Sequence, residues 1–291
     1  MLDFGFKLGR KLLPGDVYTA LQKTVGRKKI YFNQDHFLNI VAQYRRMTDF
    51  TAKTVLEFGQ ANEIATAVLM VLYGAERVYL VDKVNMYTSH GSKNSREYIA
   101  RILEAFPEKS ARTRLDAAQI ESQITFINSY LSEDVTTLIP PGTVDCILSN
   151  HVLEHVENIE DIFRTSRKLL RPGGKFCCIV DLSDHTYHFL YKYGFLLRYA
   201  PRCRFKHLEY SAKTWATLND TERLRMNRTL LPRYIEGIRR NGFAIEDVHL
   251  TREPAEFRFH PHQDVLGGYK SSDDYVNRVS GFLFSATSVS A

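Results

Sequence analysis

A glycine and a carboxylate, each at the end of a strand-like run, are the first residues in this sequence that suggest a chemistry. Gly59 ends the apolar run 55–58, and Asp82 ends a second apolar run, 78–81, 23 residues after the glycine. An apolar, helix-like segment lies between them. The βαβ pattern that holds nucleoside-containing cofactors has these parts: a tight turn at a glycine, a helix, and a carboxylate at the end of the next strand. These residues therefore predict a nucleotide-like ligand.

A second group of reactive side chains follows two later strand-like runs. His155 comes after the first of these runs, and Asp181, Asp184 and His185 come at the end of the second. Imidazoles and carboxylates are the groups that most often take a proton from a hydroxyl. We therefore expect a catalytic base among these four residues, and a purely structural role for His155 is the alternative.

The sequence predicts no metal site. Asp184, His185 and His188 lie within five positions of one another, but no further clear ligand accompanies them. The four cysteines match no paired zinc-binding spacing, and Cys146, Cys177 and Cys178 fall in strand-like runs where they act as small apolar residues. This cysteine usage indicates a reducing, cytoplasmic setting.

The elements that must position these side chains alternate between strands and helices. Strands are expected at 55–58, 78–82, 124–128, 144–149, 175–181, 243–250 and 281–289, and helices at 31–50, 64–72, 95–106, 159–170 and around 234–238. Asn62 is a plausible N-cap, and the region 251–280 reads as a long loop. The predicted class is α/β, with a seven-stranded, mostly parallel sheet covered by helices on both faces.

Five motifs in order resemble the class I S-adenosylmethionine-dependent methyltransferases. They are Val55–Gly59, Leu80–Asp82, Val144–Asn150, Val152–Val156 and Leu169–Gly174. The resemblance covers residues 51–183 well and the last strands more weakly. It implies a Rossmann-like fold and S-adenosylmethionine as cofactor. The whole chain is also similar to bacterial methyltransferases found with glycan and natural-product assembly enzymes, which implies a sugar or nucleotide-sugar acceptor.

The resemblance also assigns the cofactor-binding positions. Asp82 is expected to accept hydrogen bonds from both ribose hydroxyls of the cofactor. Gly59 has no Cβ, and this is expected to leave room for the aminoacyl part of the cofactor. The full expected set is Glu57, Gly59, Ala61, Asp82, Ser129, Tyr130, Asn150 and His151. Glu57 has an alternative role in capping neighbouring amides. The chain departs from the family pattern at Gln60-Ala61-Asn62, because Ala61 stands where a second glycine is common.

The chain divides into an N-terminal helical arm, residues 1–50, and a methyltransferase domain, residues 51–291. A helical insertion at about 185–230 is expected to form a lid over the acceptor. Eleven Lys/Arg against four Asp/Glu between 198 and 240 concentrate the basic character of a chain whose net charge is +6. This favours an anionic small-molecule acceptor, with phosphate or carboxylate held by Arg and Lys.

The first 30 residues carry seven Lys/Arg and two Asp, interleaved with apolar residues. They predict an arm that packs on the core, with contact to a membrane surface as the alternative. They lack the apolar region of a secretory signal, and no run in the chain is apolar enough to span a bilayer.

The sequence thus predicts O-methylation of a small polar acceptor. A nucleic-acid methyltransferase or binding protein would use the basic segment to follow phosphates. A non-catalytic, methyltransferase-like scaffold would explain the departure at Gln60-Ala61-Asn62. A dehydrogenase fits less well, because it would require a three-glycine fingerprint.

Overall fold

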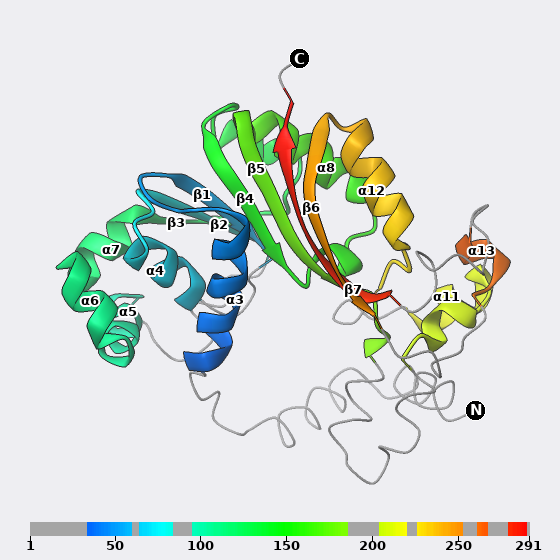
Figure 1. Ribbon diagram of the computed structural model, residues 1–291, viewed down its shortest axis with the longest axis horizontal. Coiled ribbons are helices and arrows are strands. Elements are labelled where there is room, and N and C mark those ends of the chain that lie inside the picture. The colour runs from blue at the N-terminus through cyan, green and yellow to red at the C-terminus, as the bar shows by residue number, and fades with distance from the viewer. Residues whose placement is uncertain are drawn as a thin grey trace, which may run out of the picture.

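A single seven-stranded sheet organises the molecule (Figure 1), and its strand order is β3-β2-β1-β4-β5-β7-β6. The computed structural model describes residues 34–59, 64–83, 95–185, 204–219, 226–252, 261–266 and 279–289. The strands are β1 Thr54–Phe58, β2 Arg77–Asp82, β3 Ile124–Asn128, β4 Val144–Asn150, β5 Leu170–Asp181, β6 Phe243–Arg252 and β7 Val279–Ser288. The first five are parallel, and β7 runs antiparallel to β5 and β6. The predicted α/β class and all seven strands are confirmed.

Helices cover both faces of this sheet, as expected for parallel strands. On one face lie α3 Gln34–Met47, α4 Ala65–Leu72 and α5 Ser95–Ala105, with α6 Pro107–Thr113 and α7 Ala117–Gln123 beside them. On the other face lie the 3-10 turn η2 Glu133–Thr137 and the helices α8 Ile159–Leu169 and α12 Leu231–Arg240. None of the helices within the described ranges is long and apolar enough to cross a membrane.

Strand β1 shows how the sequence divides its side chains between the two faces. Val55 packs in the core under α3 and α4, whereas Leu56 and Phe58 pack in the opposite core under α8 and α12. This alternation follows from the two-residue period of a strand. It places Glu57 on the same face as Val55, within a core that is otherwise largely apolar.

Helix α3 belongs to the core of the sheet domain. Its residues Phe37, Ile40, Val41 and Tyr44 are buried against α4. The first 33 residues of the predicted arm lie outside the described residues, so their packing and any membrane contact stay predictions.

Among the helices beside the sheet, α6 and α7 were not predicted, and one predicted N-cap was misplaced. Helix α6 buries no residue, so it carries no apolar periodicity to detect. Helix α7 begins with a capping box between Asp116 and Gln119, which is a readable sequence signal. Helix α4 begins at Ala65 with Ile64 at its cap position rather than Asn62.

Short helical segments form a small unit, called the cap here, beyond the carboxyl ends of the parallel strands. It comprises η5 Lys206–Glu209, α11 Ala212–Leu218, residues 226–230 and α13 Gln263–Leu266. The backbone amide of His262 donates to the carbonyl of Leu208 at 2.9 Å, and the amide of Ala212 donates to the Asp264 carboxylate at 2.7 Å. Part of the predicted insertion and of the predicted loop 251–280 is therefore helical.

Candidate functional site

The strand register places the predicted cofactor positions Asp82, Gly59 and Asn150 side by side across the sheet, in what is called the row here. Phe58 pairs with Val81 of β2 and with Ser149 of β4, so the next residue, Gly59, lies beside both Asp82 and Asn150. The Gly59 amide donates to the Val81 carbonyl at 3.0 Å, which fixes this position. The row crosses the point where the strand order reverses between β1 and β4, and open α/β sheets bind ligands in the crevice there.

Gly59 is required by the protein's own packing. Its φ is +81°, in the region that favours glycine. A Cβ added at this position would lie 2.2 Å from Cγ2 and 2.9 Å from Cβ of Val152, the residue that follows the end of β4 by two positions. The turn out of β1 thus packs directly on the loop after β4, a reason for the glycine that the sequence did not reveal.

Glu57 is fully buried, and its carboxylate accepts two hydroxyl hydrogen bonds. The Tyr44 hydroxyl donates to Oε1 at 3.0 Å, and the Thr66 hydroxyl donates to Oε2 at 2.6 Å. These donors come from α3 and α4, so the carboxylate ties both helices to the start of the glycine turn. These two donors are hydroxyl groups and not the neighbouring amides of the alternative role, and contact of Glu57 with the cofactor stays a prediction.

Asp82 and the residues after β3 form the far end of the row. The Asp82 side chain is at the carboxyl end of β2 and only 8% exposed. The Ser129 amide donates to the Asp82 carbonyl at 3.1 Å, so Ser129 is adjacent to Asp82. Tyr130 is 65% exposed, and Lys83 Nζ lies 5.2 Å from the centre of its ring. A carboxylate beside an exposed aromatic face is a suitable surface for a ribose and a base.

His151 stands at the other end of the row with a left-handed backbone. Its φ is +54°, and its amide donates to the Ile179 carbonyl at 2.9 Å. Its Nδ1 lies 3.5 Å from Glu154 Oε1. Burial lowers the pKa of the imidazole, but the hydrogen bond to Glu154 and the charges of Glu154 and Asp181 raise it by more, so the pKa lies above its ordinary value.

Two predicted catalytic histidines meet above the ends of β4 and β5. His155 lies on the 3-10 turn η3, Leu153–His155, and its ring centre is 4.7 Å from that of His185. The backbone amide of Asp181 donates to Glu154 Oε1 at 3.3 Å, which links this turn to the end of β5. Oδ1 of Asp181 accepts from the amide and hydroxyl of Ser183 at 2.8 and 2.6 Å.

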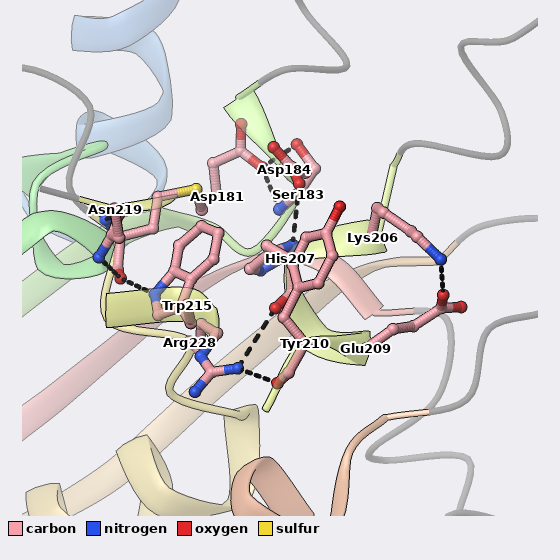
Figure 2. Close-up of polar contacts among 11 residues, drawn as sticks. Asp181, Ser183, Asp184, Lys206, His207, Glu209, Tyr210, Trp215, Asn219 and Arg228 are labelled. Carbon is pink, nitrogen blue, oxygen red and sulfur yellow. Dashed lines mark hydrogen bonds and ion pairs between the residues drawn. The ribbon is translucent and has the colours of Figure 1, made fainter. Parts of the chain in front are cut away.

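The fourth predicted catalytic residue, Asp184, faces the cap (Figure 2). Its side chain is 2% exposed, and its Oδ2 lies 3.8 Å from Nδ1 of His207. Its backbone amide donates to the Arg204 carbonyl at 2.6 Å. Asp184 is thus the least accessible of the four predicted catalytic side chains, and it anchors the cap to the end of β5.

Aromatic packing and a partly buried cation stabilise the cap. Arg228 donates to the Tyr210 carbonyl, as Figure 2 shows. The distance of this hydrogen bond is 2.5 Å, and the guanidinium carbon lies 5.5 Å from the Trp215 ring centre. The Tyr210 and Trp215 rings are stacked. The Trp215 indole donates to the Met226 carbonyl at 3.1 Å.

A cleft of about 540 Å³ opens beside the row, between α3 and the strands β5, β6 and β7. His151 and Asp181 line its end at the carboxyl edge of the sheet. Arg46 of α3 and Arg204, two residues before the cap, contribute two guanidinium groups, and His249 of β6 contributes an imidazole. Two carboxylates, those of Asp181 and Asp247, also line the cleft, so it offers cations and anions together, and it is continuous with the residues after β4 and β5.

The structure gathers most of the predicted site residues at one edge of the sheet. Ala61 lies outside the described residues, so the effect of the Gln60-Ala61-Asn62 departure is open. Two contributors were missed: Glu154, although it lies within the quoted Val152–Val156 motif, and Arg46, which only the tertiary structure brings to the cleft. Arg204 belongs to the basic segment expected to hold the acceptor, but it was not singled out there. No sequence spacing links α3 to the ends of β5 and β6.

The comparisons with known proteins agree with this geometry. The sequence profile of a family described as "Methyltransferase domain" matches residues 32–229. No curated protein matches the chain.

Two solved structures illustrate the likeness in fold. Phosphoethanolamine N-methyltransferase 2 of Haemonchus contortus, determined with S-adenosyl-L-methionine, is 14% identical with a TM-score of 0.50; the match covers 99% of this chain and 60% of that one. An S-adenosylmethionine-dependent methyltransferase of Mesorhizobium loti is 16% identical with a TM-score of 0.47, over 84% of this chain and 95% of that one.

Proposed function

The chain belongs to the methyltransferase-domain family and uses S-adenosylmethionine, and from this premise we propose that it methylates an oxygen of a small, anionic acceptor. A sugar or nucleotide sugar carrying a phosphate or carboxylate is the class that fits best. The observation that carries this proposal is the cleft of about 540 Å³ beside the strand ends, whose lining includes the two guanidinium groups of Arg46 and Arg204. Its size falls within the roughly 300–1,000 Å³ of small-molecule sites.

The residues at the carboxyl edge fit the cofactor. Asp82 would accept from the ribose hydroxyls, because its carboxylate sits at a strand end one position across from the Gly59 turn. Ser129 and Tyr130 would border the base, and Asn150 and His151 the aminoacyl and methyl end. S-adenosylmethionine supplies a methyl group on a sulfonium, which is ready for in-line displacement.

The cleft supplies the acceptor side. Arg46 and Arg204 enter it from separate elements, so one phosphate or carboxylate held between them would be fixed in orientation. Asp181 and His151 line the same cleft at the row of cofactor positions, so an acceptor anchored by the two arginines would extend toward the methyl group. Positioning of this kind supplies much of the rate in a displacement that needs little covalent help.

Transfer to a hydroxyl requires one proton to leave. The acceptor oxygen would form a bond to the methyl carbon while the carbon–sulfur bond breaks. The electron pair of the breaking bond would stay on sulfur. We propose His155, His185 and Asp181, which gather at the ends of β4 and β5, as the groups that accept the hydroxyl proton, with Asp184 as the more buried alternative.

An enzyme assay across acceptor classes tests the proposal. The full-length chain is incubated with S-adenosylmethionine and, separately, nucleotide sugars, sugar phosphates, the matching neutral sugars, and RNA and DNA oligonucleotides. Mass spectrometry then measures S-adenosylhomocysteine release and the gain of one CH₂ on each acceptor.

Methylation of an anionic sugar, with its neutral counterpart turned over far less, is the expected result. Methylation of oligonucleotides alone would replace the proposal by the nucleic-acid alternative. Cofactor binding without turnover of any acceptor would favour a non-catalytic scaffold.

A further inference from the structure

Three potential metal ligands converge at the turn after β4. Glu154, His155 and His185 each offer one ligand atom, and these atoms all lie within 4.8 Å of one another. The two imidazole rings are inclined by 59° to each other. Glu154 and His155 come from η3 and His185 from the segment after β5, so the parallel pairing of β4 and β5 brings them together.

The Glu154 carboxylate provides a second and independent observation. Its side chain is 2% exposed. Oε1 accepts from the Asp181 amide at 3.3 Å, whereas Oε2 is buried without a hydrogen-bond partner among the described residues. A buried carboxylate oxygen left without a partner is costly, and a bound cation would remove that cost.

The turn that carries two of the ligands is held rigidly from outside. The Asn227 side-chain amide donates to the carbonyls of Leu153 and Val156 at 2.6 and 2.8 Å, and its backbone amide donates to the Glu154 carbonyl at 2.8 Å. The buried Tyr234 hydroxyl donates to the Leu153 carbonyl at 3.2 Å. Ligands fixed by such support are preorganised for binding.

We propose that Glu154, His155 and His185 bind one divalent transition-metal ion. Two imidazole nitrogens and one carboxylate oxygen form a donor set suited to Zn²⁺, Mn²⁺ or Fe²⁺, whereas Mg²⁺ and Ca²⁺ prefer oxygen ligands throughout. Bonds of about 2.0–2.2 Å place ligand atoms roughly 3–3.5 Å apart, so small side-chain rotations close the group around an ion. The proposed metal site differs from the expectation from the sequence, which was that the chain has no metal ligands.

Three protein ligands leave a coordination position open for water or for the acceptor. On the proposed function, on which this step rests, the acceptor hydroxyl binds there and releases its proton to solvent more readily, because the metal stabilises the oxygen anion. His155 and His185 then hold the ion instead of taking the proton. Asp181, whose backbone amide donates to Glu154, is then the predicted base that remains to pass this proton to solvent.

Metal titration of the full-length, untagged chain tests the proposal directly. The protein is stripped with a chelator and titrated with Zn²⁺, Mn²⁺ and Mg²⁺ by calorimetry, and Co²⁺ is added to record its visible absorption. We expect one Zn²⁺ or Mn²⁺ per chain. His185→Asn and Glu154→Gln should each weaken binding by more than the roughly 10- to 100-fold that loss of an outer partner costs.

His249→Asn is the matched control, because His249 lies 2.7 Å from the Asp247 carboxylate on the exposed strand β6. It should leave the metal affinity and the Co²⁺ spectrum unchanged, whereas His185→Asn should change the spectrum. His185 is partly exposed, so its substitution is expected to preserve the fold, which circular dichroism checks.

Absence of Zn²⁺ and Mn²⁺ binding, binding of Mg²⁺ alone, or binding unaffected by His185→Asn would overturn the metal site. A stripped protein that methylates its acceptor at the full rate would also refute the metal's role while supporting the proposed function. Metal bound at Glu154, His155 and His185 in a protein that methylates no small acceptor would support the site and contradict the proposed function.

Discussion

Substitution of Gly59 by alanine tests whether the turn after β1 is shaped by protein packing. An L-residue in the left-handed region costs about 1–2 kcal/mol, and forcing atoms into an occupied space costs about 1–3 kcal/mol more. The added Cβ would lie 2.2 and 2.6 Å from the two methyl groups of Val152 and 2.9 Å from its Cβ. Rotation of the valine side chain can turn only one of these two methyl groups away, and it leaves the valine Cβ in place. We therefore expect Gly59→Ala to lower the free energy of unfolding by about 2–5 kcal/mol.

A double-mutant cycle with Val152→Ala isolates the contact. The alanine removes both crowding methyl groups, so the double variant should recover most of the packing cost and keep the backbone cost. The expected coupling energy is about 1–3 kcal/mol, measured by urea unfolding of the four proteins. Additive effects, or Gly59→Ala as stable as the wild type with only weaker cofactor binding, would refute packing as the reason for this glycine.

Three further predictions concern the cofactor, the acceptor and the core. Asp82→Ala should weaken S-adenosylmethionine binding by at least about 10-fold in calorimetry, as expected for loss of hydrogen bonds to a charged group. Asp134→Ala, a substitution of an exposed residue, should leave the affinity unchanged. Equal affinity in the two variants would contradict the assignment of Asp82 to the ribose. Arg46→Gln should raise KM for an anionic acceptor with little change in kcat, whereas Arg45→Gln, whose guanidinium stacks on a tyrosine at 4.1 Å instead of lining the cleft, should not. Burial raises the pKa of the Cys146 thiol to about 12, so iodoacetamide should label it only in unfolded protein. The thiol of the unfolded chain ionises near pH 8.5, which favours unfolding, so the contribution of Cys146 to the free energy of unfolding should fall above about that pH. Rapid labelling of the native protein would contradict the protection of this thiol by burial.

The sequence predicted the sheet well because its signals are local. Each strand is a short apolar run bounded by a turn, and the 2-residue period of β1 is enough to separate Leu56 from Glu57. Helix α6 was missed because it is short and buries no residue. The domain boundary at residue 50 stays a prediction, although Tyr44 of α3 packs in the same core as β1.

The site was predictable only as far as strand ends allow. Parallel strands bring residues such as Asp82 and Asp181 to one edge, and this follows from the order of motifs alone. The hydroxyl donors to Glu57 and the approach of His185 to Glu154 depend on packing between separate elements, which spacing does not encode. Likewise, Arg46 was assigned to the arm, yet it lines the cleft.

A crystal structure of the full-length chain with S-adenosylhomocysteine would test the central placement most directly. Both ribose hydroxyls are expected within hydrogen-bonding distance of Asp82, and the sulfur is expected between the Gly59 turn and Asn150, directed toward the cleft that Arg46 and Arg204 line. A cofactor bound elsewhere on the sheet, or a site still empty at saturating concentration, would contradict this placement.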